Sequence, residues 1–523
     1  MPRSALARTA ALLLLLALTQ PSHERDVYHK LTRGTATPAA MVPEVELDPQ
    51  YWVAEAQAAI EARLAHRESK QRARNVVMFL GDGMSVPTLA AARTLLGQRQ
   101  GVTGEEQQLA FEKFPTVGLA KTYCVDAQVA DSACSATAYL CGAKANIATI
   151  GVSGRVARGH CAAAADPQHH VHSIAEWALG DGRDAGIVTT TRVTHASPAG
   201  TYAHTADRDW ESDADVAGDC GDPRHAQHDI ALQLVHSHPG DQFKVILGGG
   251  RREFLPNTTI DEEGTRGRRI DGRNLIEEWQ ENKKARNVSY QYVWNREQLM
   301  DAAAELPEYL LGLFEGSHMQ YHMQADAHTE PTLAELTEVA IRSLNRNDRG
   351  FFLFVEGGRI DHAHHDNLVQ LSLDEAIQLS EAVARAAALL SEEDSLLLVT
   401  SDHAHVMSLS GYSQRGRDII GPSDDLGDDG VPYMTLSYAN GPGYRPNSAG
   451  REDLTQHDYH DVSFAFPSSV PLDSETHGGD DVAVFARGPH HSMFTGLYEQ
   501  SQLPHLMAYA ACMGPGRHAC AQQ

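Results

Sequence analysis

The sequence feature that most constrains the fold is an alternation of short apolar runs with helical patterns. The runs are rich in β-favouring residues and bounded by Gly or Asp, and helical patterns such as 372–390 lie between several of them. The runs span residues 75–83, 117–122, 184–191, 243–250, 351–358, 395–403 and 481–488. Strands that alternate with helices form a largely parallel sheet covered on both faces. The sequence therefore predicts an α/β fold with a large, mostly parallel central sheet flanked by helices.

Two stretches depart from this alternation. Residues 407–474 are rich in Gly, Pro, Asp, Ser and Tyr and carry only weak strand signals, so we expect an inserted surface subdomain. Residues 251–345 begin with an Arg/Glu-rich part and are expected to form a second surface excursion. The α/β core is then built from residues 71–406 and completed by residues 475–523.

The N-terminus has the pattern of a secretory signal peptide, which we assign to residues 1–22. Arg3 and Arg8 precede an apolar stretch at 10–18, and that stretch is too short to span a bilayer, which requires about 20 residues. No other segment resembles a transmembrane span. The C-terminus lacks the apolar tail of a lipid-anchor signal. We therefore expect a secreted, extracellular protein, with a lipid anchor only if the sequence is truncated there.

Residues 45–70 are expected to form an N-terminal helical arm. Within it, residues 48–67 have the pattern of an amphipathic helix ahead of the core. Its apolar side could pack on a second subunit, which would make the protein a homodimer, or on its own domain. The sequence leaves both possibilities open.

The charge of the chain limits its partners. The formal net charge is −26, and such a chain repels nucleic acids and anionic membrane surfaces. We therefore expect no nucleic-acid partner. The acidic balance fits an extracellular protein that handles cations.

Cysteines and glycosylation sequons agree with export. Seven cysteines in an exported chain indicate disulfides and an odd thiol. Cys512 and Cys520 would close a small C-terminal loop, and Cys161 and Cys220 are plausible partners. Three cysteines remain, namely Cys124, Cys134 and Cys141. They cannot all pair among themselves, so at least one of them is free. The sequons begin at Asn257 and Asn287.

Several predicted strands end in residues that can bind metal ions. Asp82, Glu356 and the pair Asp402–His403 each stand at the end of an apolar run. His195 and Ser197 lie a few residues past another run. The carboxyl ends of strands in an open α/β sheet gather around one crevice, so ligands far apart in sequence should meet there. A single Asp after a strand is more often a turn or N-cap residue, and only the combination points to a metal site.

The segment 356–366 carries the strongest of these signals. It packs three acids and three histidines directly after an apolar run, and Asp361 and His365 are four residues apart, so one helical turn could direct both at one ion. The alternative is a solvated polar loop. Together with His477 further along the chain, these residues mix imidazole and carboxylate, which suits Zn²⁺, whereas carboxylate with hydroxyl suits Mg²⁺. We infer at least two kinds of metal site.

A candidate nucleophile precedes a predicted helix. Ser132 follows Asp131 at the start of a helical stretch, where free N–H groups favour an anion. Ser132 could equally be an ordinary N-cap, but beside a zinc ion a serine hydroxyl loses its proton readily and becomes a nucleophile. Arg208 is a candidate clamp for phosphate oxygens, and the alternative for it is a surface salt bridge.

These motifs together resemble the animal alkaline phosphatases, over residues 48–520. The resemblance rests on the stretches NVVMFLGDGM, VADSACSATAYLCG, TTTRVTHASPAGTYAH, FFLFVEGGRIDHAHHDN, LLLVTSDHAHV and ETHGGDDVAVFARGP. It implies a three-layer α/β sandwich whose inserted subdomain, 407–474, is crown-like. It also implies two zinc ions and one magnesium ion.

The resemblance assigns a role to each candidate residue. The first zinc would be held by Asp361, His365 and His477, and the second by Asp82, Asp402, His403 and the Ser132 oxygen. Asp82 would also bind magnesium with Ser197 and Glu356. Arg208 would hold the phosphate and Asp131 would orient it. His195 and His405 would support the metal ligands, and His362 and His364 would be structural.

The family resemblance also implies a calcium site. Its ligands would be Glu263, the carbonyl oxygen of Phe314, Glu315 and Glu330, where Glu330 replaces the usual Asp of the family. Cys124 and Cys134 depart from the animal pattern. A disulfide between them would stiffen the loop next to Ser132.

The implied function is hydrolysis of small phosphate monoesters through a phosphoserine, with broad specificity and an alkaline pH optimum. One rival class is a sulfatase or phosphodiesterase on the same sheet. A sulfatase should show Cys-x-Pro-x-Arg, whereas the segment at Cys220 has the wrong spacing, and a diesterase usually has a Thr nucleophile. Another rival is a secreted cation-binding protein without activity, and against it every catalytic position is filled.

Overall fold

A computed structural model of the chain describes residues 43–221, 229–446 and 448–520. The predicted signal peptide and residues 521–523 of the last predicted segment lie outside the described residues. No helix in the described part combines the length and apolarity that crossing a bilayer would require.

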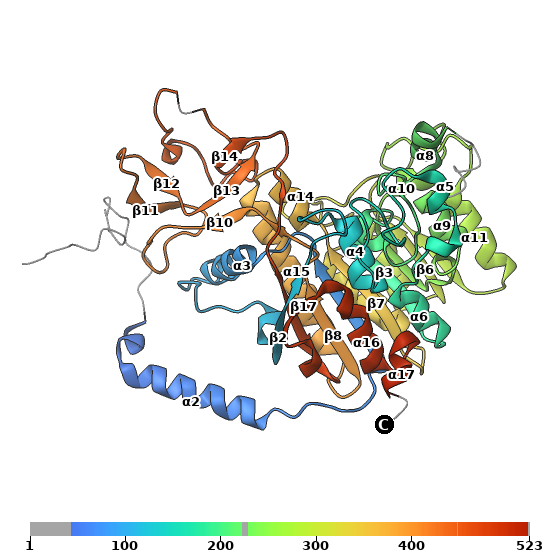
Figure 1. Ribbon diagram of the computed structural model, residues 1–523, viewed down its shortest axis with the longest axis horizontal. Coiled ribbons are helices and arrows are strands. Elements are labelled where there is room, and N and C mark those ends of the chain that lie inside the picture. The colour runs from blue at the N-terminus through green and yellow to red at the C-terminus, as the bar shows by residue number, and fades with distance from the viewer. Residues whose placement is uncertain (1–42, 222–228, 447, 521–523) are drawn as a thin grey trace, which may run out of the picture.

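The centre of the molecule is a ten-stranded sheet (Figure 1). Its strands are β1 Asn75–Gly81, β2 Thr116–Lys121, β3 Asp184–Arg192, β4 Val245–Gly249, β5 Tyr290–Val293, β6 Tyr309–Leu313, β7 Phe351–Gly357, β8 Ser395–Thr400, β16 Val482–Arg487 and β17 Gly496–Glu499. Their order in space is β17-β2-β16-β8-β1-β7-β3-β4-β6-β5. All neighbours from β8 to β5 pair in parallel, whereas β16 is antiparallel to β8 and β2. The predicted mostly parallel sheet is therefore confirmed.

Helices cover both faces of this sheet. One face is covered by α3 Val86–Arg99, α13 Leu333–Leu344 and α15 Val369–Leu389. The other is covered by α4 Ser132–Cys141, α6 Ile174–Gly180, α9 Ile230–His236, α11 Leu275–Ala285 and α16 Leu503–Ala511. The remaining α-helices are α2 Pro49–Ala65, α5 Cys161–Ala164, α7 Ala196–Ala199, α8 Asp213–Cys220, α10 Arg251–Phe254, α12 Arg296–Ala304, α14 Arg359–His365 and α17 Arg517–Cys520.

Strand β1 shows why the central runs are apolar throughout. Val77 and Phe79 pack into the core on one side of the sheet, whereas Val76 and Met78 pack into the core on the other. Because both faces are covered by helices, a polar side chain in such a strand needs a buried partner, as Asn75 at the start of β1 has in Ser395.

Residues 407–474 lie largely outside the ten-stranded sheet and form two small sheets of their own (Figure 1). One sheet contains β10 Met407–Leu409, β13 Leu436–Gly441 and β14 Ser468–Pro471; the other contains β11 Pro422–Leu426 and β12 Pro432–Met434. A further short pair, β9 Ala404–His405 and β15 His477–Gly478, connects the two ends of this segment.

The stretch 251–345 differs from the expected surface excursion. Its later part supplies β5, β6 and α13, which extend the central sheet and cover it. Leu310 of β6 pairs with Val245 of β4, and both are fully buried. The Arg/Glu-rich composition of the first part masked these short apolar runs.

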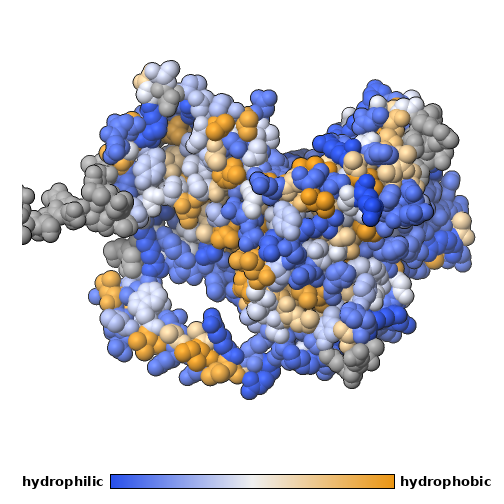
Figure 2. Space-filling view, viewed as in Figure 1, coloured by the Kyte–Doolittle hydropathy of each residue, from blue (hydrophilic) through white to orange (hydrophobic). Residues whose placement is uncertain are grey.

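Helix α2 of the N-terminal arm lies apart from the sheet (Figure 1), and none of its residues is buried. Trp52, Ile60 and Leu64 are 53%, 57% and 70% exposed, and Figure 2 shows apolar side chains along the arm. The arm contacts the rest of the chain at its two ends, where Glu46 forms an ion pair with Arg415 and His66 contacts His491. In this structure α2 therefore does not pack closely on its own domain.

The cysteines pair as Cys124–Cys134, Cys161–Cys220 and Cys512–Cys520. Cys141 is free and buried, so the expected odd thiol is present. The sequon residues Asn257 and Asn287 are both exposed.

Candidate active site

The strand-end ligands meet at the carboxyl edge of the sheet. Asp82, Glu356 and Asp402 stand at the ends of β1, β7 and β8, which are neighbours in the sheet. His195 follows β3, the next strand along. The parallel register therefore brings these side chains to one place.

The first group of ligands consists of Asp361, His365 and His477. Asp361 and His365 are one turn apart on α14, and His477 comes from β15. The His477 Nε2 atom lies 3.3 Å from Asp361 Oδ1 and 3.1 Å from His365 Nε2, and His365 Nε2 lies 3.4 Å from the same carboxylate oxygen.

The tautomers of the two imidazoles are fixed by their outer nitrogens. His477 Nδ1 donates to the Ala130 carbonyl at 2.8 Å, and His365 Nδ1 donates to the Glu475 carbonyl at 2.6 Å. In a neutral ring the proton then lies on Nδ1, so both Nε2 atoms present lone pairs to each other and to Asp361. Three lone pairs at this separation repel one another, and a cation between them would remove the repulsion. The donor set fits zinc.

The sequence missed Glu475, which holds His405 in place. His405 Nε2 lies 2.7 Å from Asp361 Oδ1, and its Nδ1 contacts Glu475 Oε2. Burial lowers the pKa of His405, but the hydrogen bonds to the two carboxylates outweigh burial and raise it to about 9. His405 therefore acts as a cation that steadies Asp361. Glu475 lies two residues before His477 in the same motif, so its position was the available signal.

The second group consists of Asp82, Asp402 and His403, all of them fully buried. His403 Nε2 lies 3.1 Å from Asp402 Oδ2 and 3.6 Å from Asp82 Oδ1. Among the described residues, neither oxygen of Asp82 has a hydrogen-bond partner, and neither does Asp402 Oδ2. Burial, and then repulsion from neighbouring carboxylates, raises the pKa of Asp82 well above its usual range. Unpartnered buried carboxylates of this kind fit a divalent cation.

The third group adds Glu356 and Ser197 to Asp82. One oxygen of Glu356 accepts hydrogen bonds from Thr189 and Thr191, and the other is buried and unpartnered in the described part of the chain. The Ser197 hydroxyl is likewise buried without a partner there. Burial raises the pKa of Glu356 to about 7. Carboxylate and hydroxyl oxygens fit magnesium.

Ser132 is free to act as a nucleophile because Asp131 caps the helix. The Asp131 side chain accepts the Cys134 N–H at 3.2 Å, and Ser132 is the first residue of α4. The alternative that Ser132 is the N-cap is thereby excluded. The Ser132 Oγ lies 3.2 Å from His403 Nε2, next to the second group.

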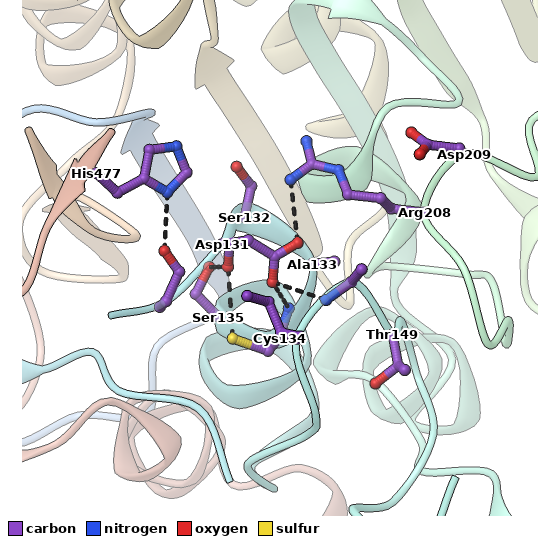
Figure 3. A network of polar contacts seen from close by, with 12 residues as sticks. Asp131, Ser132, Ala133, Cys134, Ser135, Thr149, Arg208, Asp209 and His477 are labelled. Atoms are coloured by element: carbon purple, nitrogen blue, oxygen red, sulfur yellow. Dashed lines mark hydrogen bonds and ion pairs between the residues drawn. The ribbon is translucent and has the colours of Figure 1, made fainter. Parts of the chain in front are cut away.

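Asp131 also holds Arg208 over the same site, as Figure 3 shows. Arg208 Nη1 lies 3.1 Å from Asp131 Oδ2, and its side chain is only 19% exposed. Ala148 links the two residues, since its N–H donates to Asp131 Oδ1 and its carbonyl accepts the Arg208 N–H. Arg208 is therefore a positioned guanidinium rather than a surface salt bridge.

A cluster of three imidazoles begins next to Arg208. His195 Nε2 accepts from Arg208 at 3.2 Å, and His195, His318 and His362 bring their nitrogens within 4.8 Å of one another. Burial and nearby cations lower the pKa values of all three, so the rings are neutral. The sequence missed His318, which stands in the loop after β6, a strand that was not predicted.

His364 has the structural place expected of it. Its two ring nitrogens contact Thr88 Oγ1 at 3.0 Å and Tyr438 OH at 2.8 Å. These contacts join α14 to α3 and β13.

The predicted calcium residues lie near one another but are not all unpartnered. Glu263 pairs with Arg251 at 2.8 Å. One oxygen of Glu330 accepts the Gln320 N–H, whereas the other is buried without a partner in the described residues. Burial, and then the charges of Glu315 and Glu263, raises the pKa of Glu330 to about 7. Phe314, whose carbonyl is the fourth predicted ligand, is buried at the end of β6.

Comparison with known proteins gives one family. The profile of the alkaline phosphatase family matches residues 73–513. A membrane-bound alkaline phosphatase of Bombyx mori is 60% identical over 503 residues, which cover 95% of this chain and 91% of that protein. The tissue-nonspecific alkaline phosphatase of Homo sapiens is 44% identical over 498 residues, covering 94% of each.

Solved structures share the fold. The alkaline phosphatase of Thermus thermophilus superposes with a TM-score of 0.59 at 22% identity, covering 90% of this chain and 95% of that one. The enzyme from the Antarctic bacterium TAB5 superposes with a TM-score of 0.57 at 20% identity, covering 86% and 100%.

Proposed function

The chain belongs to the alkaline phosphatase family and is therefore a phosphoric monoester hydrolase, and we propose that it acts through a phosphoserine at Ser132, supported by two zinc ions and one magnesium ion. The observation that carries this proposal is the position of the Ser132 hydroxyl. It lies 3.2 Å from His403 Nε2 and next to buried carboxylate oxygens of Asp82 and Asp402 that have no hydrogen-bond partner among the described residues.

Each group of ligands supports one ion. Asp361, His365 and His477 would hold the first zinc. Asp82, Asp402 and His403, with the Ser132 oxygen, would hold the second. Asp82, Glu356 and Ser197 would hold magnesium. When bound, these cations would lower the pKa of hydroxyl groups and water and neutralise phosphate charge.

The residues of the chain perform two displacements at phosphorus. Arg208 grips the non-bridging oxygens of the phosphate, and Asp131 and His195 keep the guanidinium in place. Ser132 Oγ forms a bond to phosphorus while the ester bond to the leaving alcohol breaks. Water then attacks the phosphoserine, the Oγ–P bond breaks, and Ser132 and inorganic phosphate are released. Because only the phosphate is gripped, we expect a broad range of small monoesters and, since water must give up a proton, an alkaline pH optimum.

Substrate class and metal dependence are tested together. We expect the purified protein to hydrolyse a chromogenic phosphate monoester much faster than the matching diester or sulfate ester, because the site neutralises a dianion. A chelator should remove this activity, and zinc with magnesium should restore it. Metal analysis should find two zinc ions and one magnesium ion per chain. Unchanged turnover in chelator would refute the proposal, and faster diester cleavage would favour the phosphodiesterase rival.

Calcium is proposed near Glu263, Glu315, Glu330 and the Phe314 carbonyl. The support is an all-oxygen donor set with one buried, unpartnered carboxylate oxygen on Glu330. The same metal analysis checks it, since calcium should be present at one ion per chain and should persist after zinc is removed.

We propose that the arm packs on a second copy of the chain. Its support is the exposed apolar series on α2, a helix none of whose residues is buried in its own domain. Light scattering should give twice the mass of the chain. The double variant Ile60→Asp/Leu64→Asp should shift the protein towards the monomer, whereas Gln57→Asp on the same helix should not. A full-length protein that is monomeric at micromolar concentration would contradict this.

An extracellular location is also proposed. Three disulfides and two exposed sequons support it, and peptide mapping of the exported chain for glycans at Asn257 and Asn287 checks it.

A further inference from the structure

The loop between β2 and α4 supplies three parts of the proposed active site. Its last residues are Ala130 and Asp131, and Ser132 follows directly. Asp131 holds Arg208, and Ser132 carries the nucleophilic oxygen. The third contribution is the Ala130 carbonyl, which accepts a hydrogen bond from His477 Nδ1.

The Ala130 carbonyl fixes how His477 faces the first zinc position. Its bond to Nδ1 measures 2.8 Å, and the opposite atom, Nε2, lies 3.3 Å from Asp361. Outer hydrogen bonds of this type set both the tautomer and the orientation of a ligating imidazole. The loop must therefore hold its backbone in place for His477 to bind metal well.

The middle of this loop has little packing of its own. Val125 and Val129 are 55% and 37% exposed. Its middle is attached to the segment after α4 by hydrogen bonds from the Val125 N–H to the Ala145 carbonyl and from the Ile147 N–H to Asp126. At the two ends of the loop, Lys144 Nζ donates to the Tyr123 carbonyl and the Ala148 N–H donates to Asp131. Few buried apolar contacts leave such a loop with low local stability unless something else restrains it.

That restraint is the disulfide between Cys124 and Cys134. It joins the start of the loop to the first turn of α4, two residues beyond Ser132, across a sequence separation of 10. Both cysteines are only 2% exposed and pack on Ala130 and Ala145. The resulting covalent ring encloses all three parts of the site that the loop supplies.

We propose that the Cys124–Cys134 disulfide is a positioning element of the active site. It keeps the Ala130 carbonyl against His477 and holds Asp131 and Ser132 in register with the metal ligands. Without it the loop gains freedom, His477 turns away from the first zinc position, and zinc is released faster. This inference rests on the function proposed above.

The chain offers a matched control for this bond. The Cys512–Cys520 disulfide closes a ring of similar size, with a separation of 8, at the end of α16. The pair Cys124→Ala/Cys134→Ala is therefore compared with Cys512→Ala/Cys520→Ala. Alanine suits the first site because its neighbours Ala130 and Ala145 are apolar and small.

Three measurements are made on each folded protein. We expect removal of the first disulfide to speed the transfer of zinc to a chelator about tenfold or more, the range seen when a contact that orients a metal ligand is lost. In the metal-free proteins, hydrogen exchange should rise in residues 125–135. The kcat should fall by a similar factor. The control pair should stay within about twofold of the unaltered chain in all three.

Each other result has a definite meaning. Zinc release and loop exchange that match the control would overturn the proposal. So would a first pair that fails to fold while the control pair folds, because the bond would then stabilise the whole chain and not the loop. If the unaltered protein binds no zinc and hydrolyses no monoester, the proposed function fails. The exchange of residues 125–135 in the metal-free chain would still report whether the disulfide restrains the loop.

Discussion

The Ser132→Ala variant should lose at least about a thousandfold in turnover of phosphate monoesters, the order expected when a covalent nucleophile is removed. Ser132 Oγ is the hydroxyl placed between Asp131, which holds Arg208, and the ligands Asp402 and His403. Without it no phosphoserine can form, and only direct attack by water remains.

The fold should survive this substitution. The helix keeps its N-cap, because the Asp131 side chain and not Ser132 accepts the Cys134 N–H. Alanine is also a good helix residue at the first position of α4. The melting temperature should therefore stay close to that of the unaltered protein, and inorganic phosphate should still bind through Arg208. The second zinc should bind more weakly because it loses the Ser132 oxygen, whereas the other two ions should be retained.

Ser135→Ala is the matched control. Ser135 is fully buried in the same helix and donates to the Asp131 carbonyl at 2.9 Å, away from the metal ligands. Its loss should change turnover only a few fold. If Ser132→Ala keeps turnover within tenfold of the unaltered enzyme while Ser135→Ala does the same, Ser132 is not the nucleophile.

Most of the strands that could be predicted are buried on both faces, although β2 was predicted with Leu119 40% exposed and β6 was missed with every residue buried. β1 and β7 carry continuous apolar runs because helices cover them on each side. The edge strands gave no such signal. β5 is only partly buried over most of its length, and Leu497 in β17 is 57% exposed. A strand that packs on one side only, or on none, has no reason to be apolar throughout.

The candidate ligands were predictable for a related reason, and their supporting contacts were not. Asp82 and Glu356 sit at fixed positions relative to buried strands, so the topology of the sheet alone brings them together. Glu475 and the Ala130 carbonyl meet His405 and His477 only because loops of particular shape carry them there. Hydrogen bonds between loops depend on backbone geometry that residue patterns do not encode.

Asp82 shows that the metal ligands lower the stability of the folded chain when no cation is bound. It is fully buried, and neither of its oxygens has a hydrogen-bond partner among the described residues. Burial and the charges of Asp402, Asp361 and Glu356 raise its pKa, so its ionised form is unfavourable in the folded metal-free chain. Glu356 makes the same point, because the rise of its pKa from 4.5 to about 7 corresponds to about 3 kcal/mol.

The sign of the pH dependence follows from these raised values. A carboxyl whose pKa is higher in the folded state stabilises the fold fully below its unfolded pKa. That contribution is lost as the pH rises through the folded pKa. For Glu356 this window runs from about 4.5 to about 7. In the metal-free protein the contribution of these carboxyls to stability should therefore be smaller at pH 8 than at pH 5, and divalent cations should reverse the loss.

We accordingly expect Asp82→Asn to abolish turnover and yet stabilise the metal-free protein at pH 8. Asn removes the unfavourable buried charge, so the metal-free variant should melt several degrees above the metal-free parent at pH 8 and close to it at pH 5. The same change removes a ligand shared by the second and third groups, so zinc and magnesium should both bind more weakly and turnover should fall by at least about a thousandfold.

Asp301→Asn, at an exposed position on α12, should alter neither property. The measurement is thermal unfolding with and without chelator at the two pH values, alongside turnover. If the metal-free Asp82→Asn protein melts no higher than its parent at pH 8, the ionised Asp82 carboxylate does not destabilise the metal-free fold. Retained turnover would show that Asp82 does not bridge two ions. Opposite effects on stability and activity are what distinguish a metal ligand from a residue that only supports the fold, because a structural carboxylate stabilises the chain whether or not metal is bound.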